Sequence, residues 1–532
     1  MQDPAHSNTS AKGRGHRAWL ALGILVLGAI GVVAMHLQVE LERNYKLWFT
    51  LAIGVLVLLL ELIWFLFLSR FRWRTRLVTF GALILLSFAL SKIVRVDGSI
   101  DGAGLPRLAW RWSQVPRKLT AAPIPVAVQA LTPASDPRRA GLRDVPHFYG
   151  LNRDGVVRDA HLASDWTATP PKELWRQPIG AGWSAFAVVD GRAYTQEQRG
   201  EQELVTCYDA LTGQLLWSHA DTANFQQWQG GEGPRATPSI DRGQVFTVGA
   251  TGILNCLDAT TGKRAWTRNI LIDHKLENLT WGVSASPLVH EETVVVTGGL
   301  TNGPTVMGYD RATGEPRWQS GTDKASYASP SVAMLAGRKV LLYSSAAALM
   351  ALDPGTGEML LRYPWAEDKQ PRASQPVVLE GDRVFLSAGY GLGCLLVEVK
   401  AGADGKLTGR EIWKSIRMKT QFNSVTARDG FVYGLDDGIL ACVDLANGER
   451  KWKSGRYGSG QTLLVDDLLI IQSEPGAVVL AAANPAQFQE LGRIPALSAK
   501  TWNHPTLAGR YLLLRNSEEA VCYELPLAAA GR

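Results

Sequence analysis

One spaced pattern recurs from residue 209 onward: an Asp, a Gly four residues later, and a Trp four residues after that. The full copies are Asp209–Gly213–Trp217, Asp258–Gly262–Trp266, Asp310–Gly314–Trp318 and Asp444–Gly448–Trp452. Two weaker copies are Asp353–Gly357–Leu361 and Gly409–Trp413, which has lost the Asp. The Gly positions lie 39 to 52 residues apart. A period of this size is typical of propellers and solenoids.

Each repeat consists of short apolar runs that are bounded by turn residues. Gln244–Val248 is one such run, and Ile253–Asp258 follows it after a Gly-rich turn. These lengths and patterns are strand signals. In the turn, the Asp can accept backbone hydrogen bonds and the Gly supplies a positive φ. The Trp begins the outermost strand and offers a large apolar face to the neighbouring sheet.

A second marker leads each repeat and combines small residues with a frequent Pro. The eight markers are Ser184–Ala187, Ala236–Pro238, Ala285–Pro287, Ala328–Pro330, Ser374–Pro376, Asn423–Val425, Gly458–Gly460 and Asn503–Pro505. Small residues suit a crowded innermost strand, and Pro suits the first residue of a strand. Because one sheet cannot bury both of its faces, the sheets must stack around an axis. We therefore predict an all-β, eight-bladed propeller of four-stranded antiparallel blades.

The two ends of the repeat region complement each other. Tyr511–Arg515 and Ala520–Tyr523 are inner strands with no Trp strand after them. Glu173–Arg176 is a Trp strand with no inner strands before it. We expect the two halves to complete one blade and to close the ring.

The Asp-x-x-Thr-Gly-x-x-x-Trp pattern resembles the repeat of pyrroloquinoline-quinone (PQQ) type β-propellers. Tyr149–Gly155 also resembles the lead-in of PQQ-binding-like propeller proteins. The family includes quinoprotein alcohol dehydrogenases and non-enzymatic BamB-like envelope proteins. The resemblance covers about residues 145–525. It implies the fold, whereas the repeat residues themselves are structural and carry no activity.

Three apolar runs precede the propeller, at Ala18–Leu37, Leu47–Leu68 and Leu77–Val94. Each approaches the ~20 residues needed to span a bilayer. Reading the first run as a cleaved signal peptide is disfavoured, because two further runs follow at once. We therefore predict a polar, disordered cytoplasmic tail at 1–17, a membrane anchor of three transmembrane helices at 18–94, a Pro-rich linker at 95–146 and the propeller at 147–532.

Arginines set the predicted orientation of the anchor. Four of them fill the short loop between the second and third runs, at Arg70, Arg72, Arg74 and Arg76. The positive-inside rule places this loop and the N-terminus in the cytoplasm. Three spans then deliver the propeller to the periplasmic side of a bacterial inner membrane. Trp110 and Trp112 fit either the interface on the outer side of this inner membrane or a solvated linker.

Charge is concentrated in the same region. Residues 1–94 hold ten Lys and Arg against four Asp and Glu, and the remaining 45 basic and 45 acidic residues balance. The high isoelectric point therefore reports membrane topology, and no basic patch predicts nucleic-acid binding.

The five cysteines do not indicate disulfides or metal binding. Four of them occupy one repeat position, two residues before the turn acid: Cys207, Cys256, Cys442 and Cys522. Equivalent positions in different blades are too far apart to bridge. We expect these four and Cys394 to be buried free thiols that fill apolar space.

Residues that precede the inner strands should converge at one mouth of the central channel. The candidates are Glu232, Arg235, Asn278, Trp281, Tyr327, Arg372, Lys419, Asn423, Trp502 and Asn503. Such a ring could bind an anionic or planar ligand. Alternatively, these residues hydrogen-bond the loops and plug the channel.

The sequence leaves two functions open. We favour a non-catalytic binding or scaffold module with envelope proteins as partners, no cofactor and no metal. The alternative, implied by the resemblance, is a PQQ-dependent dehydrogenase that uses Ca²⁺ and passes electrons from an alcohol or sugar to membrane quinone. The chain lacks the adjacent cysteine pair that many such enzymes carry, and it also lacks their long insertions.

Overall fold

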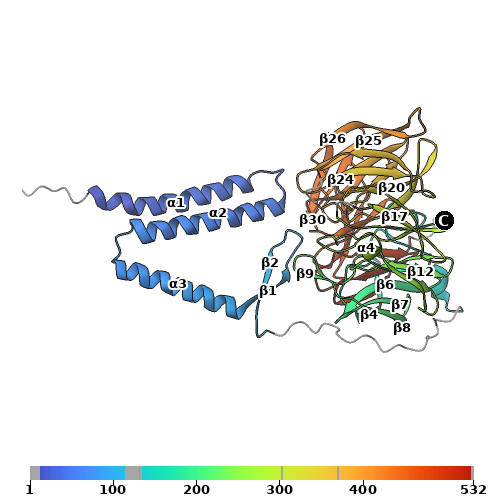
Figure 1. The fold of residues 1–532 in the computed structure, drawn as a ribbon, viewed down its shortest axis with the longest axis horizontal. Helices are drawn as coiled ribbons and strands as arrows, with labels where there is room; N and C mark the ends of the chain where they lie inside the picture. The colour runs from blue at the N-terminus through green and yellow to red at the C-terminus, as the bar shows by residue number, and fades with distance from the viewer. Residues whose placement is uncertain (1–11, 114–130, 132–134, 301–302, 368–370, 529–532) are drawn as a thin grey trace, which may run out of the picture. The chain divides into compact units, whose positions relative to one another are not determined.

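The computed structural model describes residues 12–113, 131, 135–300, 303–367 and 371–528. The chain divides into two compact units, Met1–Gln114 and Val115–Arg532. The first unit contains the long helices, and the second contains the propeller (Figure 1).

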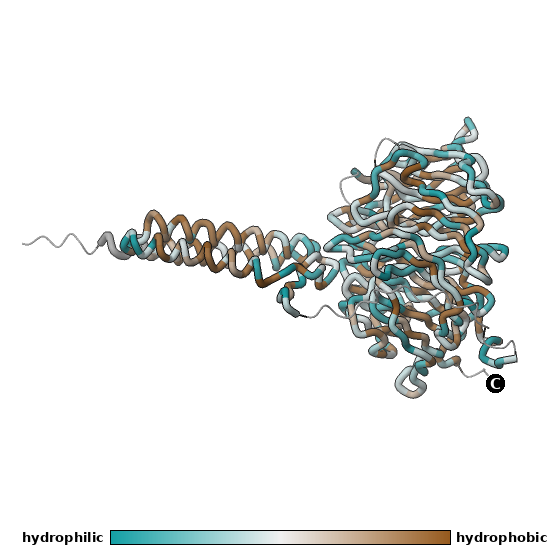
Figure 2. Tube along the Cα trace, turned by 60° about the horizontal axis from the view of Figure 1, so that its bottom comes forward, coloured by the Kyte–Doolittle hydropathy of each residue, from teal (hydrophilic) through white to brown (hydrophobic). Residues whose placement is uncertain are grey.

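The helices of the first unit agree closely with the three apolar runs. They are α1 (Lys12–His36), α2 (Arg43–Ile63) with its π-helical continuation η1 (Trp64–Leu68), and α3 (Trp73–Ile93). The segments Ala18–His36, Arg43–Leu68 and Trp73–Ile93 are long and apolar enough to cross a membrane. Hydrophobic residues run along the helices (Figure 2). Residues 12–17, which we expected to be disordered, begin α1, and residues 1–11 lie outside the described residues.

Part of the segment that we expected to be a linker folds with its neighbours. A hairpin of β1 (Val94–Ser99) and β2 (Pro106–Trp110) follows α3 directly. The 3-10 turn η2 (Pro137–Gly141) belongs to the second unit, and Val145 forms a bridge with Val188 in its first blade. Residues 114–130 and 132–134 lie outside the described residues.

Eight sheets confirm the predicted eight blades. Blade 1 contains β5 (Ala187–Val189), β6 (Arg192–Arg199), β7 (Gln202–Asp209) and β8 (Leu215–Thr222). Blade 2 contains β11 (Ser239–Asp241), β12 (Gln244–Val248), β13 (Ile253–Asp258) and β14 (Arg264–Asn269). Blade 3 contains β15 (Leu288–His290), β16 (Thr293–Thr297), β17 (Val306–Asp310) and β18 (Pro316–Ser320). Blade 4 contains β19 (Ser331–Leu335), β20 (Arg338–Ser344), β21 (Ala348–Leu352) and β22 (Met359–Pro364).

The remaining blades follow the same antiparallel order. Blade 5 contains β23 (Val377–Leu379), β24 (Arg383–Ala388), β25 (Gly393–Ala401) and β26 (Leu407–Ser415). Blade 6 contains β27 (Thr426–Arg428), β28 (Phe431–Asp436), β29 (Ile439–Asp444) and β30 (Arg450–Arg456). Blade 7 contains β31 (Gln461–Val465), β32 (Leu468–Gln472), β33 (Val478–Ala482) and β34 (Glu490–Ile494), with β3 (Val156–Val157) parallel to β31. Outside the blades lie the helix α4 (Ile270–Asp273) and the small hairpin of β9 (Gln226–Gln227) and β10 (Gly231–Glu232).

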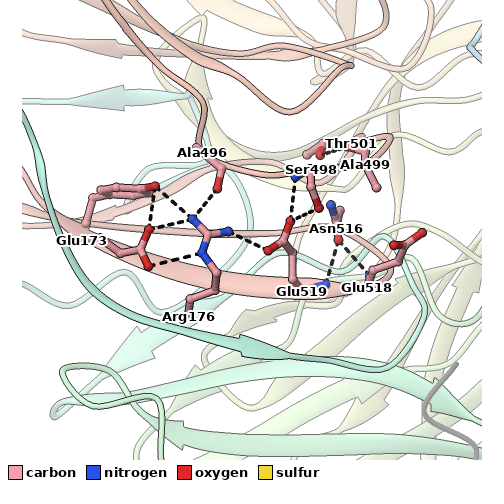
Figure 3. Close-up of polar contacts among 10 residues, drawn as sticks. Glu173, Arg176, Ala496, Ser498, Ala499, Thr501, Asn516, Glu518 and Glu519 are labelled. Atoms are coloured by element: carbon pink, nitrogen blue, oxygen red, sulfur yellow. Dashed lines mark hydrogen bonds and ion pairs between the residues drawn. The ribbon is translucent and has the colours of Figure 1, made fainter. Parts of the chain in front are cut away.

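Blade 8 closes the ring as predicted. It contains β35 (Thr506–Ala508), β36 (Tyr511–Arg515), β37 (Glu519–Glu524) and, as its outer strand, β4 (Lys172–Pro178) from the start of the domain. Trp175 of β4 lies opposite Cys522 of β37. Arg176 of β4 connects the two halves of this blade and its neighbour: it donates to Glu173, Glu519, Tyr523 and the carbonyl of Ala496, which follows blade 7 (Figure 3). Strand β4 thus supplies the fourth strand of blade 8 and joins the start and the end of the domain in one sheet.

The Trp and Gly of the repeat contact each other across neighbouring blades. In five pairs of neighbouring blades the ring of the Trp lies on the turn Gly of the next blade: Trp175–Gly213, Trp217–Gly262, Trp266–Gly314, Trp318–Gly357 and Trp413–Gly448. Indole Nε1 also donates to a carbonyl of that turn: Trp175 to Ala210, Trp217 to Ala259, Trp266 to Arg311 and Trp413 to Leu445, at 2.9 to 3.1 Å. The turn Asp holds the turn itself, since Asp209 Oδ1 accepts from Leu211 N at 2.9 Å. The repeat therefore encodes the joint between blades.

In one weak copy of the repeat, the predicted turn residue is wrong. Gly409 is not a turn residue: it lies inside β26, opposite Val399 and against Tyr363. The strands β25 and β26 are nine residues long, so their turn has moved outward to Gly402–Lys406. Trp413 keeps its place opposite Leu396. Lengthening the hairpin shifted the turn and left the Trp contact intact.

The second marker forms a belt of hydrogen bonds around the axis. A marker side chain of one blade accepts from the backbone N–H of the preceding blade. The successive bonds are Ala185 N to Thr237 Oγ1 (3.0 Å), Thr237 N to Ser286 Oγ (2.9 Å), Ser286 N to Ser329 Oγ (2.8 Å), Ser329 N to Gln375 Oε1 (3.2 Å) and Gln375 N to Ser424 Oγ (3.1 Å). In these blades the marker therefore supplies a hydroxyl or amide acceptor for a buried backbone N–H as well as small size.

The cysteines are free and buried, as predicted. Four of them lie opposite a blade Trp, in the pairs Cys207–Trp217, Cys256–Trp266, Cys442–Trp452 and Cys522–Trp175. Burial raises the pKa of each thiol, so all five stay protonated near neutral pH.

Two glycines with the same backbone conformation test the Trp–Gly joint. Gly314 and Gly243 have φ of 73° and 75°, so an added Cβ costs similar backbone strain at both. At Gly314 the Cβ would lie 2.6 Å from the Trp266 ring, and at Gly243 it would meet nothing within 4 Å. We expect Gly314→Ala to destabilise the propeller by about 1–3 kcal/mol more than Gly243→Ala. Equal shifts of the urea unfolding midpoint would show that the ring does not need the glycine.

Candidate binding mouth of the propeller

The loops that precede the inner strands meet in one nearly continuous ring, which we call the mouth. Its contacts run from Phe422 to Trp502 (5.1 Å between ring centroids) and from Trp502 to Trp183 (4.8 Å). Trp183 Nε1 then donates to the carbonyl of Gly230, against which the Trp281 ring lies. These contacts join loops of blades 6, 8, 1, 2 and 3.

The ring continues through two further blades. Trp281 meets Tyr327 edge to face, with 5.6 Å between centroids, and Tyr327 N donates to Arg372 O at 2.8 Å. Burial raises the pKa of the Tyr327 phenol to about 12, so it remains a neutral hydrogen-bonding group. Gln461 of blade 7 links the loops of blades 6 and 8, because its Nε2 donates to the carbonyls of Phe422 and Trp502 at 3.0 Å.

The cationic candidates turn inward and hold loop carbonyls. Arg235 donates to Gly231 O at 2.9 Å and stacks on Phe225, 4.5 Å from the ring centroid. Its burial lowers its pKa to about 10, which still leaves it charged at neutral pH. Arg372 is buried, donates to Glu367 O and lies over the Trp365 ring.

Lys419 and the amide candidates also fasten loops. Lys419 Nζ donates to Ile416 O at 2.9 Å and lies 3.4 Å from the buried carboxylate of Asp436. The amide donors reach backbone carbonyls: Asn278 to Ala250 (2.9 Å), Asn423 to Leu435 (3.3 Å) and Asn503 to Ser184 (2.8 Å). Glu232 ends the small hairpin, opposite Gln226. These side chains shape the mouth and present few free polar groups to a ligand.

The aromatic side chains remain partly exposed at the mouth. Trp183, Trp281, Tyr327, Phe422 and Trp502 are all of intermediate exposure. Trp228 lies between β9 and β10, and its side chain is 44% exposed. Lys500 lies above this surface, with Nζ 4.1 Å from the centroid of Trp502 and 5.6 Å from that of Trp183.

Four of these residues were missed by the sequence analysis: Trp183, Trp228, Phe422 and Lys500. Trp183 had a readable signal, because it stands just before the marker Ser184–Ala187, much as Trp281 and Trp502 precede their own markers. Trp228 lies in the turn between β9 and β10, and Lys500 lies in the loop before β35, where no repeat position identifies them.

The other end of the channel is crossed by the lead-in segment. Gly155 O accepts from Leu464 N at 2.9 Å, near the end of an inner strand that lies away from the mouth. Arg153 is buried and donates to Pro330 O (3.0 Å) and Ser239 Oγ (3.0 Å), while Tyr149 donates to Val425 O at 2.8 Å. With no carboxylate among these contacts, burial lowers the pKa of Arg153 to about 9. The two ends therefore differ: backbone crosses one, and aromatic side chains ring the other.

The fold and the mouth define a PQQ-type eight-bladed propeller, and comparison with known proteins places the chain in a family. The family model described as "Outer membrane protein assembly factor BamB" matches residues 166–269 and 201–454, more than half of the chain. The chain belongs to this family.

Two curated relatives represent both branches. BamB of Burkholderia pseudomallei is 25% identical over 280 residues, which cover 51% of this chain and 68% of that protein. Quinohemoprotein alcohol dehydrogenase ADH-IIG of Pseudomonas putida is 30% identical over 140 residues. That match spans 25% of this chain and only 18% of the dehydrogenase.

Solved structures share the fold. BamB from Moraxella catarrhalis superposes with a TM-score of 0.51 and 16% identity, over 68% of this chain and 99% of that one. Quinohemoprotein alcohol dehydrogenase from Comamonas testosteroni gives 0.50 and 13%, over 73% and 82%. At these identities the likeness concerns architecture alone.

Proposed function

We propose that the protein is a membrane-anchored, non-catalytic binding propeller of the bacterial cell envelope, and that its mouth docks envelope proteins. The observation that carries the proposal is the ring of partly exposed aromatic side chains at one end of the propeller. Trp and Tyr are enriched at protein-binding hot spots because they bury much area for little lost entropy. The BamB relative, an outer membrane protein assembly factor by name, supports a role in assembly.

Cross-linking at the mouth tests this function. A photo-reactive amino acid at Trp228 should give adducts of discrete mass in intact cells, and adding Trp281→Ala should remove most of them. The matched control is the same amino acid at Leu151, which is also exposed but belongs to the lead-in segment at the other end. If adducts form at Leu151 and none form at Trp228, the partner-binding surface lies at the opposite end of the propeller.

We infer that the mouth is not the alternative, a dehydrogenase site for PQQ and Ca²⁺, from two observations. Among the residues that the structure describes, no three His, Cys, Asp or Glu side chains gather closely enough to hold a metal ion. Arg235 and Lys419, which could have faced quinone oxygens, hold Gly231, Ile416 and Asp436 instead. Titration of the purified chain with PQQ and Ca²⁺ should give no stoichiometric binding. Tight binding with alcohol- or sugar-dependent dye reduction would establish the enzyme.

Topology can be tested separately. The proposed inner-membrane location and periplasmic propeller rest on three apolar helices and the four-arginine loop. Alkaline phosphatase fused after Arg532 should be active, because it requires export, whereas a fusion at Arg74 should be inactive. The reverse pattern would invert the anchor.

A further inference from the structure

The hairpin that follows α3 has one apolar face. In the register of β1 and β2, Val94 pairs with Trp110 and Val96 pairs with Leu108. Because side chains alternate along a strand, these four lie on one face of the hairpin. The side chains of Val96 and Leu108 are 55% and 65% exposed, although both are apolar.

Two tryptophans extend this face, and the opposite face is polar. Trp112 stacks on Trp110 with 5.2 Å between centroids and 7° between ring planes, and both are at least half exposed. On the polar side, Arg107 forms an ion pair with Asp97 at 3.3 Å. The hairpin is therefore amphipathic, and within its own unit nothing covers the exposed apolar side chains of its described residues.

The helices fix where this hairpin lies. In a chain of three spans, the end of α1, the start of α2 and the end of α3 lie on the same side of the membrane. An ion pair of 2.7 Å between Arg43 at the start of α2 and Asp101 in the hairpin turn joins these points directly. Asp101 is buried, as are Glu42 and Asn44 beside Arg43. No residue separates α3 from β1, and Arg111 N donates to Ile93 O at 2.9 Å.

We propose that the face formed by Val96, Leu108, Trp110 and Trp112 lies in the headgroup layer of the same bilayer, on the side where α3 ends. The argument is continuity: a hairpin held to two helix ends at the membrane surface has phospholipid beside it. Trp is the residue most favoured at that depth, and arginines on the other face remain hydrated or contact phosphates. Residues 94–113 then act as an interfacial foot of the anchor. The proposal rests on the proposed membrane anchoring.

Single introduced cysteines can test the foot in the full-length protein. The five native thiols are buried, with raised pKa, so a thiol-reactive fluorophore labels the new position selectively. The variants are Leu108→Cys on the apolar face, Arg107→Cys on the polar face of the same strand, and Leu58→Cys, an exposed position in the middle of α2. The protein is reconstituted in phosphatidylcholine–phosphatidylglycerol vesicles, and quenching by iodide is compared with quenching by lipids that carry a nitroxide near the headgroup.

The label at residue 108 should emit at shorter wavelength than the label at 107 and should be quenched by the lipid nitroxide, whereas 107 should be quenched by iodide. Equal iodide quenching at 107 and 108 overturns the foot, because the hairpin is then solvated. Shielding of 108 from both quenchers also overturns it, because a protein surface then covers the face. The label at 58 separates the two proposals: if nitroxides deep in the bilayer fail to quench it, the membrane anchor itself is wrong.

Discussion

Replacing Trp175 with alanine should lower the free energy of unfolding of the propeller by about 3–5 kcal/mol, the usual cost of truncating a buried aromatic side chain. Trp175 is buried, lies on Gly213 of blade 1 and donates to Ala210 O at 3.0 Å. It sits on the strand that closes the ring, so its loss loosens blade 8 and exposes a sheet edge. Urea unfolding of the detergent-solubilised chain, followed by circular dichroism, measures the shift.

The neighbouring residue provides the control. Arg176 forms ion pairs with Glu173 at 2.7 Å and with Glu519 at 2.6 Å (Figure 3), but its side chain is 34% exposed. Exposed ion pairs contribute little because water already solvates both charges, so Arg176→Gln should cost about 1 kcal/mol or less. Deleting Glu173–Gln177 should abolish cooperative unfolding altogether. A larger effect of Arg176→Gln than of Trp175→Ala would mean that the ion network, and not the Trp–Gly joint, closes the ring.

The architecture could be predicted because each repeat residue makes a contact that depends on spacing. Asp209 binds amides two and three residues away, and the Trp of one blade needs the Gly of the next. Both requirements recur in every regular blade and therefore remain visible in the sequence. Where a strand lengthens, as at Gly409, the local pattern no longer marks the turn although the fold is unchanged.

The site could be predicted only as far as its loops. Repeat position shows that Arg235 and Lys419 precede inner strands, but it does not show which way they turn. Arg235 donates to several loop carbonyls, and Lys419 lies between the Ile416 carbonyl and the Asp436 carboxylate, so both cations are held inside. The rings of Trp281 and Trp502 pack against other aromatic and cationic side chains of the mouth, and both residues remain partly exposed.

The hairpin after α3 shows a different limit. We predicted a linker at residues 95–146 because of Pro106 and the prolines that follow it. Pro106 is instead the first residue of β2, where a missing N–H is tolerated. The exposed apolar face became visible only when the register of β1 and β2 was known.

A single buried carboxyl should give the propeller a marked pH dependence. Glu203 of blade 1 contacts the Gly249–Ala250 turn of blade 2, where Ala250 N donates to Glu203 Oε2 at 3.1 Å. Burial is the main cause that raises its pKa from 4.5 to about 7, and Asp221 opposite adds to the rise, while Ala250 N–H and Arg235 oppose it. In the unfolded chain the carboxyl is solvated and returns to its ordinary value.

The sign of the effect follows from proton uptake. Between pH 4.5 and about 7 the folded protein holds a proton on Glu203 that the unfolded chain has lost. Stability therefore falls as the pH rises through this window, by roughly 3 kcal/mol in total, and levels off above it. Glu203→Gln keeps an acceptor for Ala250 N without a charge. The variant should match the parent protein at pH 5 within about 1 kcal/mol and exceed it by roughly 3 kcal/mol at pH 8.

Glu201→Gln is the matched control, because Glu201 lies two residues away at the exposed turn between β6 and β7. Its removal should leave the slope of stability against pH as it is in the parent protein. Urea midpoints at pH 5, 6, 7 and 8 for the three proteins measure that slope, and the difference between parent and Glu203→Gln cancels the contribution of every other titrating group. Parallel curves for parent and Glu203→Gln would mean that Glu203 is already ionised in the folded protein at pH 5. In that case its carboxylate must gain compensation from Arg235, and the loop that carries this arginine into the mouth would be held by an ion pair across blades 1 and 2.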